Sequence, residues 1–194
     1  MEKRGYTSID RYPVVARWRD DVEFTGASIY CFQPYVVSGE AEPPAEELII
    51  PQPSLRFNDV DNVGITGRHY TNFTMIGQTC FKEGEEYDQD RYFKDMFEFT
   101  TEALGIPKEK LILHEDSWGG GGNLGACMEF FVDGLELFNQ VYMFYEQTPE
   151  GYEELDLKVL DMGMGHERIT WISNGTETSY ESVMPETLEK MKEE

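Results

Sequence analysis

Positively charged residues are scarce in this chain. Its 194 residues include 16 Lys and Arg against 38 Asp and Glu, which gives a formal net charge of −22. Proteins that hold nucleic acid usually present a basic face to the phosphates, and an acidic surface repels an RNA backbone at long range. The composition therefore argues against a nucleic-acid-binding surface. It also permits the hypothesis that the acidic surface is an adaptation to a salty cytoplasm.

Cysteines and long apolar runs are also few. The three cysteines, Cys31, Cys80 and Cys127, lie far apart and lack the spacing of zinc ligands, so we expect free thiols in a reducing compartment. No run approaches the length of a membrane-spanning helix, and the polar start has no signal-peptide core. We therefore expect a cytoplasmic protein. Hydrophobic residues make up 40% of the chain, which suits one domain with a substantial core.

Two arginines and a histidine lie close together in one segment, residues 55–73. Arg56, Arg68 and His69 fall within 14 residues, after a short apolar stretch that predicts a strand and a turn at Asn58-Asp59. Arginine carries a planar fork of donors suited to phosphate. A long loop with an arginine at each end could therefore close over a polyphosphate. The alternative is that both arginines pair with carboxylates on the surface.

A second segment, residues 158–172, combines glycines with an arginine. An apolar run leads through Gly163 and Gly165 into a helical pattern with Arg168 in its first turn. A strand, a glycine turn and a helix with an early arginine can place a guanidinium and helix-start amides beside an anion. The alternative is a tight turn whose glycines only satisfy backbone geometry.

The remaining pattern favours an α+β domain with an antiparallel sheet, because strands outnumber helices and include a hairpin. The predicted elements are an exposed connection at 38–48, extended structure interrupted by prolines at 48–57, a helix over 88–104, a short strand at 110–116, a hairpin turn at Asp133-Gly134, and a charged helix from Pro185 to Glu194.

Several blocks together resemble one family. They are RYPVVARWRDDVEFTGASIYCFQPYVVSGE (11–40), RFNDVDNVGITGRHYTNFTMIGQ (56–78), WGGGGNLGACMEFF (118–131), GLELFNQVYMFYE (134–146) and LDMGMGHER (160–168). The second and last resemble motifs 2 and 3 of class II aminoacyl-tRNA synthetases, and the wording is similar to the alanyl-tRNA synthetases of archaeal type. The resemblance covers nearly the whole chain. It implies a mixed, mostly antiparallel sheet flanked by helices, and a single catalytic domain over residues 1–194.

The resemblance implies an ATP site. Arg56 would hold the α-phosphate and the substrate carboxylate, while Arg68 and His69 would lie over the β- and γ-phosphates. Phe73 would stack on adenine, and Arg168 would contact the far phosphates from the opposite side. For Phe73 the alternative is an ordinary core residue.

The resemblance also implies an amino-acid site. Asp161 matches the carboxylate that binds the substrate ammonium group, and Trp118 and Val141 match residues that enclose the alanine methyl group. Asn139 would orient the substrate, beside Gly163. An unpaired buried carboxylate is costly, so Asp161 on an apolar run makes sense if a cationic ligand meets it. The alternative is that Asp161 caps a turn.

Glu129 and Glu136 would be ligands of Mg²⁺, which prefers hard oxygens shared with phosphates. The alternative is that both are strand carboxylates facing solvent. His114 and His166 have no convincing partner in the sequence and are interpreted as structural or solvent-facing.

The chain departs from the family pattern at a few positions. Phe144 stands where the family usually has Gln, Ala126 where it often has Pro, and Thr79-Cys80 where it often has His-Ala. If Phe144 points into the pocket, its bulk would alter amino-acid choice. Motif 1 is nearly absent, and the family's tRNA-binding, editing and C-terminal oligomerisation regions are not expected in these residues.

Three functional hypotheses follow. The first is an enzyme that uses ATP and Mg²⁺ to activate alanine or a similar small amino acid as an aminoacyl-adenylate, for transfer to tRNA, a carrier protein or a small amine. The second is a non-catalytic paralogue that binds an amino acid or nucleotide, or regulates a partner. The third is the catalytic part of a full alanyl-tRNA synthetase.

Overall fold

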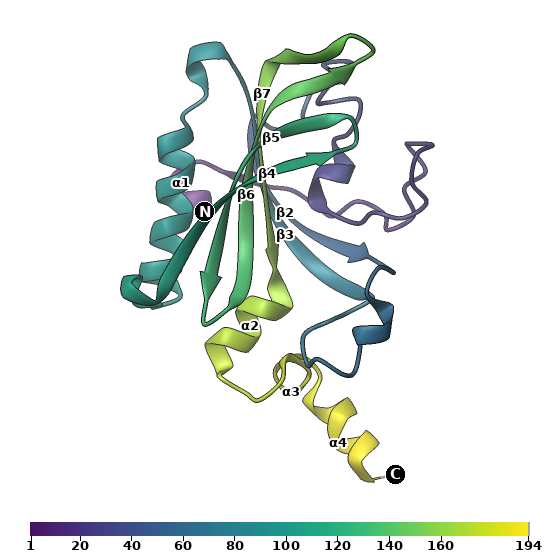
Figure 1. Cartoon of the computed structure of the whole chain (residues 1–194), viewed down its shortest axis with the longest axis vertical. Helices are drawn as coiled ribbons and strands as arrows, with labels where there is room; N and C mark the ends of the chain where they lie inside the picture. The colour runs from purple at the N-terminus through teal and green to yellow at the C-terminus, as the bar shows by residue number, and fades with distance from the viewer. Residues whose placement is uncertain (194) are drawn as a thin grey trace.

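The computed structural model describes residues 1–193 and is built on one seven-stranded sheet (Figure 1). The strand order is β1-β2-β3-β7-β6-β5-β4, and of these neighbours β1 and β2 are parallel while the others are antiparallel. The strands are β1 (Thr7–Ser8), β2 (Glu47–Leu55), β3 (Asn72–Glu83), β4 (Leu111–Gly120), β5 (Asn123–Val132), β6 (Leu135–Thr148) and β7 (Gly151–Gly165). The predicted α+β class with a mixed, mostly antiparallel sheet is confirmed.

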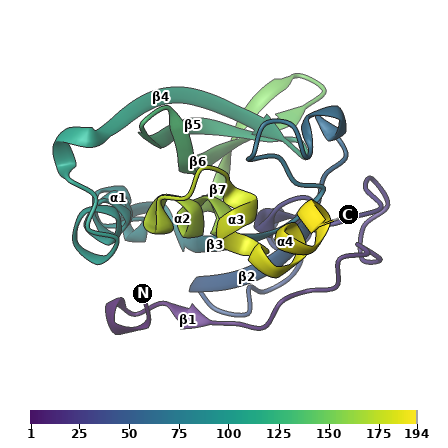
Figure 2. The same cartoon turned by 90° about the horizontal axis from the view of Figure 1, so that it is seen from below.

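One long helix lies along one face of the sheet, and the C-terminal helices lie beyond one end of its strands (Figures 1 and 2). The longer ones are α1 (Gln89–Glu98), which continues into a π-helical turn (Phe99–Ala103), α2 (His166–Asn174), α3 (Ser179–Val183) and α4 (Pro185–Glu193). Short 3₁₀ turns are η1 (Glu2–Arg4), η2 (Ser28–Cys31), η3 (Val60–Asn62), η4 (Gly84–Glu86) and η6 (Lys108–Lys110). The helices predicted over 88–104 and from Pro185 are confirmed, and Glu194 lies outside the described residues. Across residues 1–193, the helices are too short or too polar to cross a membrane.

Strand β2 runs through its two prolines, so the predicted interruption at 48–57 is wrong. Pro51 and Pro53 pair in register with Ile76 and Thr74 of β3. The carbonyl of Ile49 accepts a hydrogen bond from the β1 side, and residues two and four further along present their backbone to that same side. Strand β1 pairs only with Leu48 and Ile49, so proline at positions 51 and 53 removes no ladder hydrogen bond.

The predicted hairpin between β5 and β6 is confirmed. Asp133 and Gly134 both have positive φ, 51° and 79°, as a two-residue type I′ turn requires. The strand predicted at 110–116 is longer than expected, because β4 includes Gly119 and Gly120 and the turn follows at 121–122.

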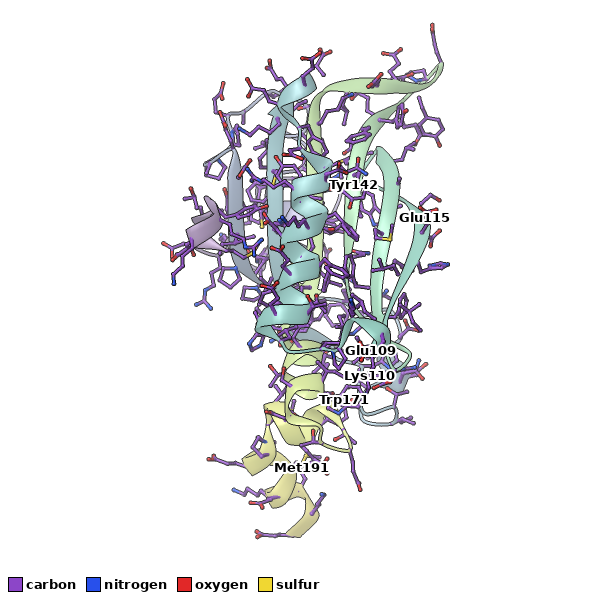
Figure 3. All side chains as sticks on the ribbon, turned by 90° about the vertical axis from the view of Figure 1, so that its left-hand side faces the viewer. Glu109, Lys110, Glu115, Tyr142, Trp171 and Met191 are labelled. Atoms are coloured by element: carbon purple, nitrogen blue, oxygen red, sulfur yellow. The ribbon has the colours of Figure 1, made fainter. Side chains whose placement is uncertain are left out.

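The sheet separates two cores. On one face, η2 and the chain after it pack on Leu48, Phe81, Val141 and Met143. On the other face lies α1 (Figure 3). Its Met96 and Tyr92 belong to the hydrophobic clusters that pack there. The three cysteines are free and buried. Because side chains alternate along a strand, neighbouring strand residues serve different faces.

Candidate active site

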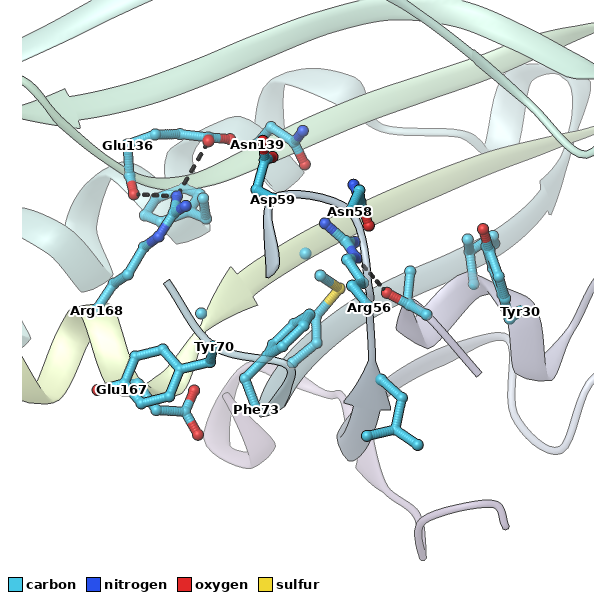
Figure 4. A pocket seen from close by; sticks show the side chains of 18 of the residues that line it. Tyr30, Arg56, Asn58, Asp59, Tyr70, Phe73, Glu136, Asn139, Glu167 and Arg168 are labelled. Carbon is cyan, nitrogen blue, oxygen red and sulfur yellow. Dashed lines mark hydrogen bonds and ion pairs between the residues drawn. The ribbon is translucent and has the colours of Figure 1, made fainter. Parts of the chain in front are cut away.

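A cavity of about 820 Å³ opens on the η2 face of the sheet (Figure 4). Its wall includes eleven of the twelve predicted site residues: Arg56, Arg68, His69, Phe73, Trp118, Glu136, Asn139, Val141, Asp161, Gly163 and Arg168. Glu129 is not among the lining residues. Segments more than a hundred residues apart in the chain therefore meet around one hollow.

Arg56 follows β2 and is anchored at the cavity wall. Its Nε donates to the carbonyl oxygen of Gly26 at 2.7 Å, and its Cζ lies 5.3 Å from the centre of the Phe73 ring. Burial lowers the pKa of Arg56, and repulsion from Arg168 lowers it further, while Glu136 and Asp161 are among the groups that oppose this. Arg56 makes no carboxylate pair within residues 1–193, so the surface-pairing alternative is wrong for this residue.

Phe73 begins the cavity side of β3. It is half-buried and belongs to none of the hydrophobic clusters formed by the described part of the chain. The ordinary-core alternative for Phe73 is therefore wrong. One face of its ring lies against the guanidinium group of Arg56, which is the geometry of a cation–π contact.

Arg168 is held by a carboxylate inside the cavity. Strand β7 passes directly into α2, which places Arg168 in the first turn. Its Nη1 donates to the backbone oxygen of Glu136 at 2.8 Å and to Oε2 of Glu136 at 3.1 Å. Glu136 is consequently partnered rather than simply solvent-facing.

Asp161 lies in the middle of β7, paired in register with Thr79 on one side and Val141 on the other. The turn-capping alternative for Asp161 is therefore wrong. The residue is only 7% exposed, and its Oδ1 has no hydrogen-bond partner in the described chain. Burial raises the pKa of Asp161 to about 7, and the nearby positive charge of Arg56 opposes the rise.

The motif glycines lie within β7 rather than in a turn, which corrects that prediction. A Cβ on Gly163 would come 2.8 Å from the sulfur of Met75, so only glycine leaves room for the Met75 side chain at this position. Likewise, a Cβ on Gly120 would come 2.7 Å from the ring of Trp118. Gly120 thus lets the indole fold over the strand to form a wall of the cavity with Val141.

The loop between β2 and β3 carries Arg68 and His69. Arg68 is exposed and has no hydrogen-bond or ion-pair partner within residues 1–193, so the surface-pairing alternative is also wrong for it. His69 is half-buried, and its Nδ1 lies 2.5 Å from the hydroxyl of Thr66.

Glu129 and His114 form a pair that the sequence reading missed. His114 Nδ1 lies 2.8 Å from Glu129 Oε2 across β4 and β5, so the interpretation of His114 as partnerless is wrong. Together with Asp116, these side chains bring ligand atoms within 4.8 Å of one another. His166, by contrast, is exposed as expected.

Phe144 points to the other face of the sheet. Its ring packs on Tyr87 at 5.3 Å and beneath the amine of Lys158, and it does not line the cavity. The condition under which Phe144 would alter amino-acid choice, that it points into the pocket, is therefore not met.

Several lining residues were not found from the sequence, among them Tyr30, Met75 and Glu167. Glu167 is buried, and its Oε1 accepts from the backbone N–H of Thr74 at 2.9 Å, which ties α2 to β3. The signal was its position beside Arg168, but helical spacing alone did not indicate which face it occupies.

Comparisons with known proteins identify the family that the chain resembles. The family model described as tRNA synthetases class II (A) matches residues 1–194. The chain is 53% identical over 195 residues to the alanine–tRNA ligase of Methanocella arvoryzae, covering 97% of this chain and 22% of that protein. It is 46% identical over 212 residues to that of Halobacterium salinarum, covering 100% of this chain and 23% of that protein. The chain thus spans about a fifth of the length of these relatives.

Solved structures support the fold. A pyrrolysyl-tRNA synthetase from Desulfitobacterium hafniense superposes with a TM-score of 0.61 at 16% identity, over 93% of this chain and 67% of that chain. A second structure of that enzyme gives a TM-score of 0.59 at 13% identity, over 94% and 68%. From the family model and the identities above, this chain belongs to the class II tRNA synthetase family of the alanine–tRNA ligases.

Proposed function

We propose that this chain uses ATP to activate alanine or a similar small amino acid as an aminoacyl-adenylate. The observation that carries the proposal is the pairing of opposite chemistries in one cavity. Asp161 offers a buried carboxylate oxygen without a partner, and Arg56 stands near enough to influence its pKa. An amino acid has an ammonium group for the first and a carboxylate for the second.

The reaction joins a carboxylate oxygen of the amino acid to the α-phosphorus of ATP. The bond from that phosphorus to the bridging oxygen of the β-phosphate breaks, and pyrophosphate leaves with the electron pair. Such chemistry depends on positioning and charge neutralisation rather than on a proton shuttle. Arg56 would contact the α-phosphate and the substrate carboxylate, and Arg68, His69 and Arg168 would neutralise the outer phosphates.

The remaining lining residues would set ligand shape. Phe73 would stack on the adenine ring, and Trp118 and Val141 would enclose a methyl-sized side chain. Asn139 would orient the substrate beside Gly163. These roles are proposed from their positions around the cavity and from family membership.

The donor set also fits Mg²⁺, which class II synthetases use with ATP. Glu136 brings a carboxylate to the cavity wall, and Mg²⁺ favours carboxylates shared with phosphate oxygens. When bound, the ion would neutralise phosphate charge. Glu136 would have to exchange its contact with Arg168 for the ion, which frees Arg168 for phosphate. Glu129 would contribute from beyond the lining residues, where it now faces His114.

The proposal stops at the adenylate, formed in the cytoplasm where ATP and amino acids are present. Relatives named alanine–tRNA ligases suggest tRNA as the acceptor. However, this chain spans about a fifth of their length and carries a net charge of −22, which opposes approach of an RNA backbone. We therefore expect weak or no tRNA charging by these residues alone.

ATP–pyrophosphate exchange tests the proposal. We expect exchange with alanine, and a loss of about 10²- to 10³-fold in Arg56→Ala, as for removal of one donor to developing charge. Arg17→Ala is the matched control, because Arg17 is exposed and does not line the cavity. Absence of exchange with alanine, glycine and serine, together with measurable binding of ATP or alanine by calorimetry, would instead establish a non-catalytic binding protein.

A further inference from the structure

The loop between β2 and β3 is fixed on both sides of Arg68, although most of it is exposed. Before Arg68, the carbonyl of Gly67 accepts hydrogen bonds from both the backbone N–H and the hydroxyl of Ser179, at 2.8 and 2.5 Å. After Arg68, the carbonyl of His69 accepts from the hydroxyl of Tyr180 at 2.8 Å. The partners are consecutive residues at the start of α3, more than a hundred positions downstream.

The same two side chains make further contacts with the loop. The hydroxyl of Tyr180 also accepts from the backbone N–H of Gly64 at 2.8 Å, so one group joins two loop positions. Tyr70 donates to the hydroxyl of Ser179 at 2.7 Å, and the rings of Tyr70 and Tyr180 meet edge to face at 5.2 Å. A loop that only connects two strands does not need so many hydrogen bonds and ring contacts to a distant helix.

Gly67 is shaped for this contact. It is buried with φ of 76°, and a Cβ there would come 3.1 Å from the Cγ2 of Thr178. Both the backbone conformation and the close approach favour glycine. The side chain of Arg68 itself remains without a partner among residues 1–193, although the carbonyls on either side of it are bound.

We propose that Ser179 and Tyr180 are positioning residues that hold the 56–71 loop so that Arg68 is poised over the phosphate end of the cavity. We refer to these two residues as the loop clamp. The proposal rests on the proposed function, in which Arg68 contacts ATP phosphates. Ordering a loop at the moment of binding weakens affinity, and a loop that is already ordered avoids that cost.

The clamp also links the two cationic arms of the site. It lies on α3, which a capping box between Thr178 and Glu181 starts. Trp171 of α2 donates through Nε1 to the carbonyl of Thr176 at 2.7 Å and fixes the connection between the helices. Because α2 also carries Arg168, a continuous segment sets the positions of both Arg168 and the Arg68 loop (Figure 1).

The test is Tyr180→Phe in the 194-residue chain, measured by ATP–pyrophosphate exchange with alanine. Removing one hydroxyl deletes two hydrogen bonds to the loop, so we expect the KM for ATP to rise about tenfold. The KM for alanine and kcat should stay within about twofold. Tyr152→Phe is the matched control, because Tyr152 is exposed on the β6–β7 hairpin, away from the cavity. Ser179→Ala should raise the KM for ATP several-fold, against Ser173→Ala as its control on the exposed side of α2.

A double-mutant comparison separates positioning from general structure. If the clamp acts through Arg68, then Arg68→Ala should cost much less in the Tyr180→Phe background than in the parent chain. Equal costs in both backgrounds would overturn the proposal. So would a Tyr180→Phe chain that loses affinity for ATP and alanine equally, together with a lower melting temperature.

A second readout does not require activity. Trypsin cleaves after exposed arginines, and Arg68 is exposed on a held loop. Cleavage after Arg68 should be several-fold faster in Tyr180→Phe and Ser179→Ala than in the parent and control chains. If the parent chain shows no exchange with any amino acid, the proposed function fails while the proteolysis still tests the clamp. If the rate of cleavage after Arg68 is unchanged in both clamp variants, the proposed role of Ser179 and Tyr180 is wrong, whatever the exchange assay shows.

Discussion

Two buried aspartates lie on opposite faces of the sheet and have different surroundings. Asp95 on α1 is 5% exposed, and its carboxylate accepts from Arg4 at 2.5 Å and from the Tyr6 hydroxyl at 2.8 Å. Asp161 on β7 is 7% exposed, and its Oδ1 has no partner within residues 1–193. Equal burial therefore comes with a complete set of partners on one face and an incomplete set on the other.

The difference is the one we expect between a structural acid and the ammonium-binding acid that we propose. A buried carboxylate is costly unless it is paired. Asp95 is paired with Arg4 and Tyr6, which belong to the chain itself. On the cavity face, the burial that raises the pKa of Asp161 to about 7 is opposed by Arg56 without a direct contact. A cationic ligand would complete the set there.

The largest expected effect is loss of amino-acid activation in Asp161→Asn. An amide cannot neutralise an ammonium group, so we expect amino-acid-dependent exchange to fall at least about 100-fold, or about 3 kcal/mol of transition-state stabilisation. Asp95→Asn should leave the KM for alanine within about twofold. A KM for alanine that is unchanged in Asp161→Asn would remove the proposed ammonium site.

The second effect is on stability, and it should fall on the other aspartate. Asp95→Ala leaves the buried Tyr6 hydroxyl without its acceptor and breaks the pair with Arg4. We expect a loss of about 2–4 kcal/mol in the free energy of unfolding, because one partner of a buried pair is removed. Urea unfolding of Asp95→Ala and of the parent chain measures this loss. A loss no larger than that of an exposed control such as Asp20→Ala would show that the Asp95 contacts contribute little.

A smaller effect should appear as a pH dependence. The pKa of Asp161 is about 7 in the folded chain against 3.8 for an ordinary aspartate, so the folded state binds a proton that the unfolded state has released between these values. The stability associated with this proton is fully present below pH 3.8 and is lost as the pH rises through 7. Asp161→Asn removes the dependence.

We therefore expect Asp161→Asn to be more stable than the parent chain by about 1–3 kcal/mol at pH 8, with the difference shrinking as the pH falls toward 4. The full three-unit shift would correspond to about 4 kcal/mol, and the buried amide offsets part of it. Thermal unfolding of both chains from pH 4 to 8 measures the trend. If the difference in stability between the two chains does not vary with pH, burial does not raise the pKa of Asp161.

The sequence predicted the features that depend on local chemistry or on family motifs. The hairpin turn at Asp133-Gly134 needs two residues that tolerate positive φ, and an Asp-Gly pair is typical of such a turn. The apolar spacing of 88–104 predicted α1. The meeting of Arg56 and Arg168 around one cavity came from the motif resemblance, since no local pattern brings residues so far apart together.

The features that the sequence did not predict depend on strand register and long-range contact. Strand β2 continues through Pro51 because its neighbour on that side is only two residues long. His114 meets Glu129 because β4 and β5 pair in a register that places them opposite each other. The contact of Tyr180 with the loop joins positions 111 and 116 residues apart. None of these can be derived from spacing along one segment.

The smallest expected effect tests whether the two faces are independent in amino-acid choice. Phe144 packs on Tyr87 on the face of Asp95, not on the cavity. Replacing it by the family's usual residue, Phe144→Gln, should therefore leave the relative rates of exchange with alanine, glycine and serine within about twofold. Loss of one half-buried aromatic contact should cost about 1 kcal/mol of stability. Val141→Ala, which enlarges the cavity itself, is the contrasting variant and should shift these rates toward serine. If Phe144→Gln shifted them as much as Val141→Ala does, the sheet would be transmitting changes from one face to the other, and the partner sets of Asp95 and Asp161 could not be treated separately.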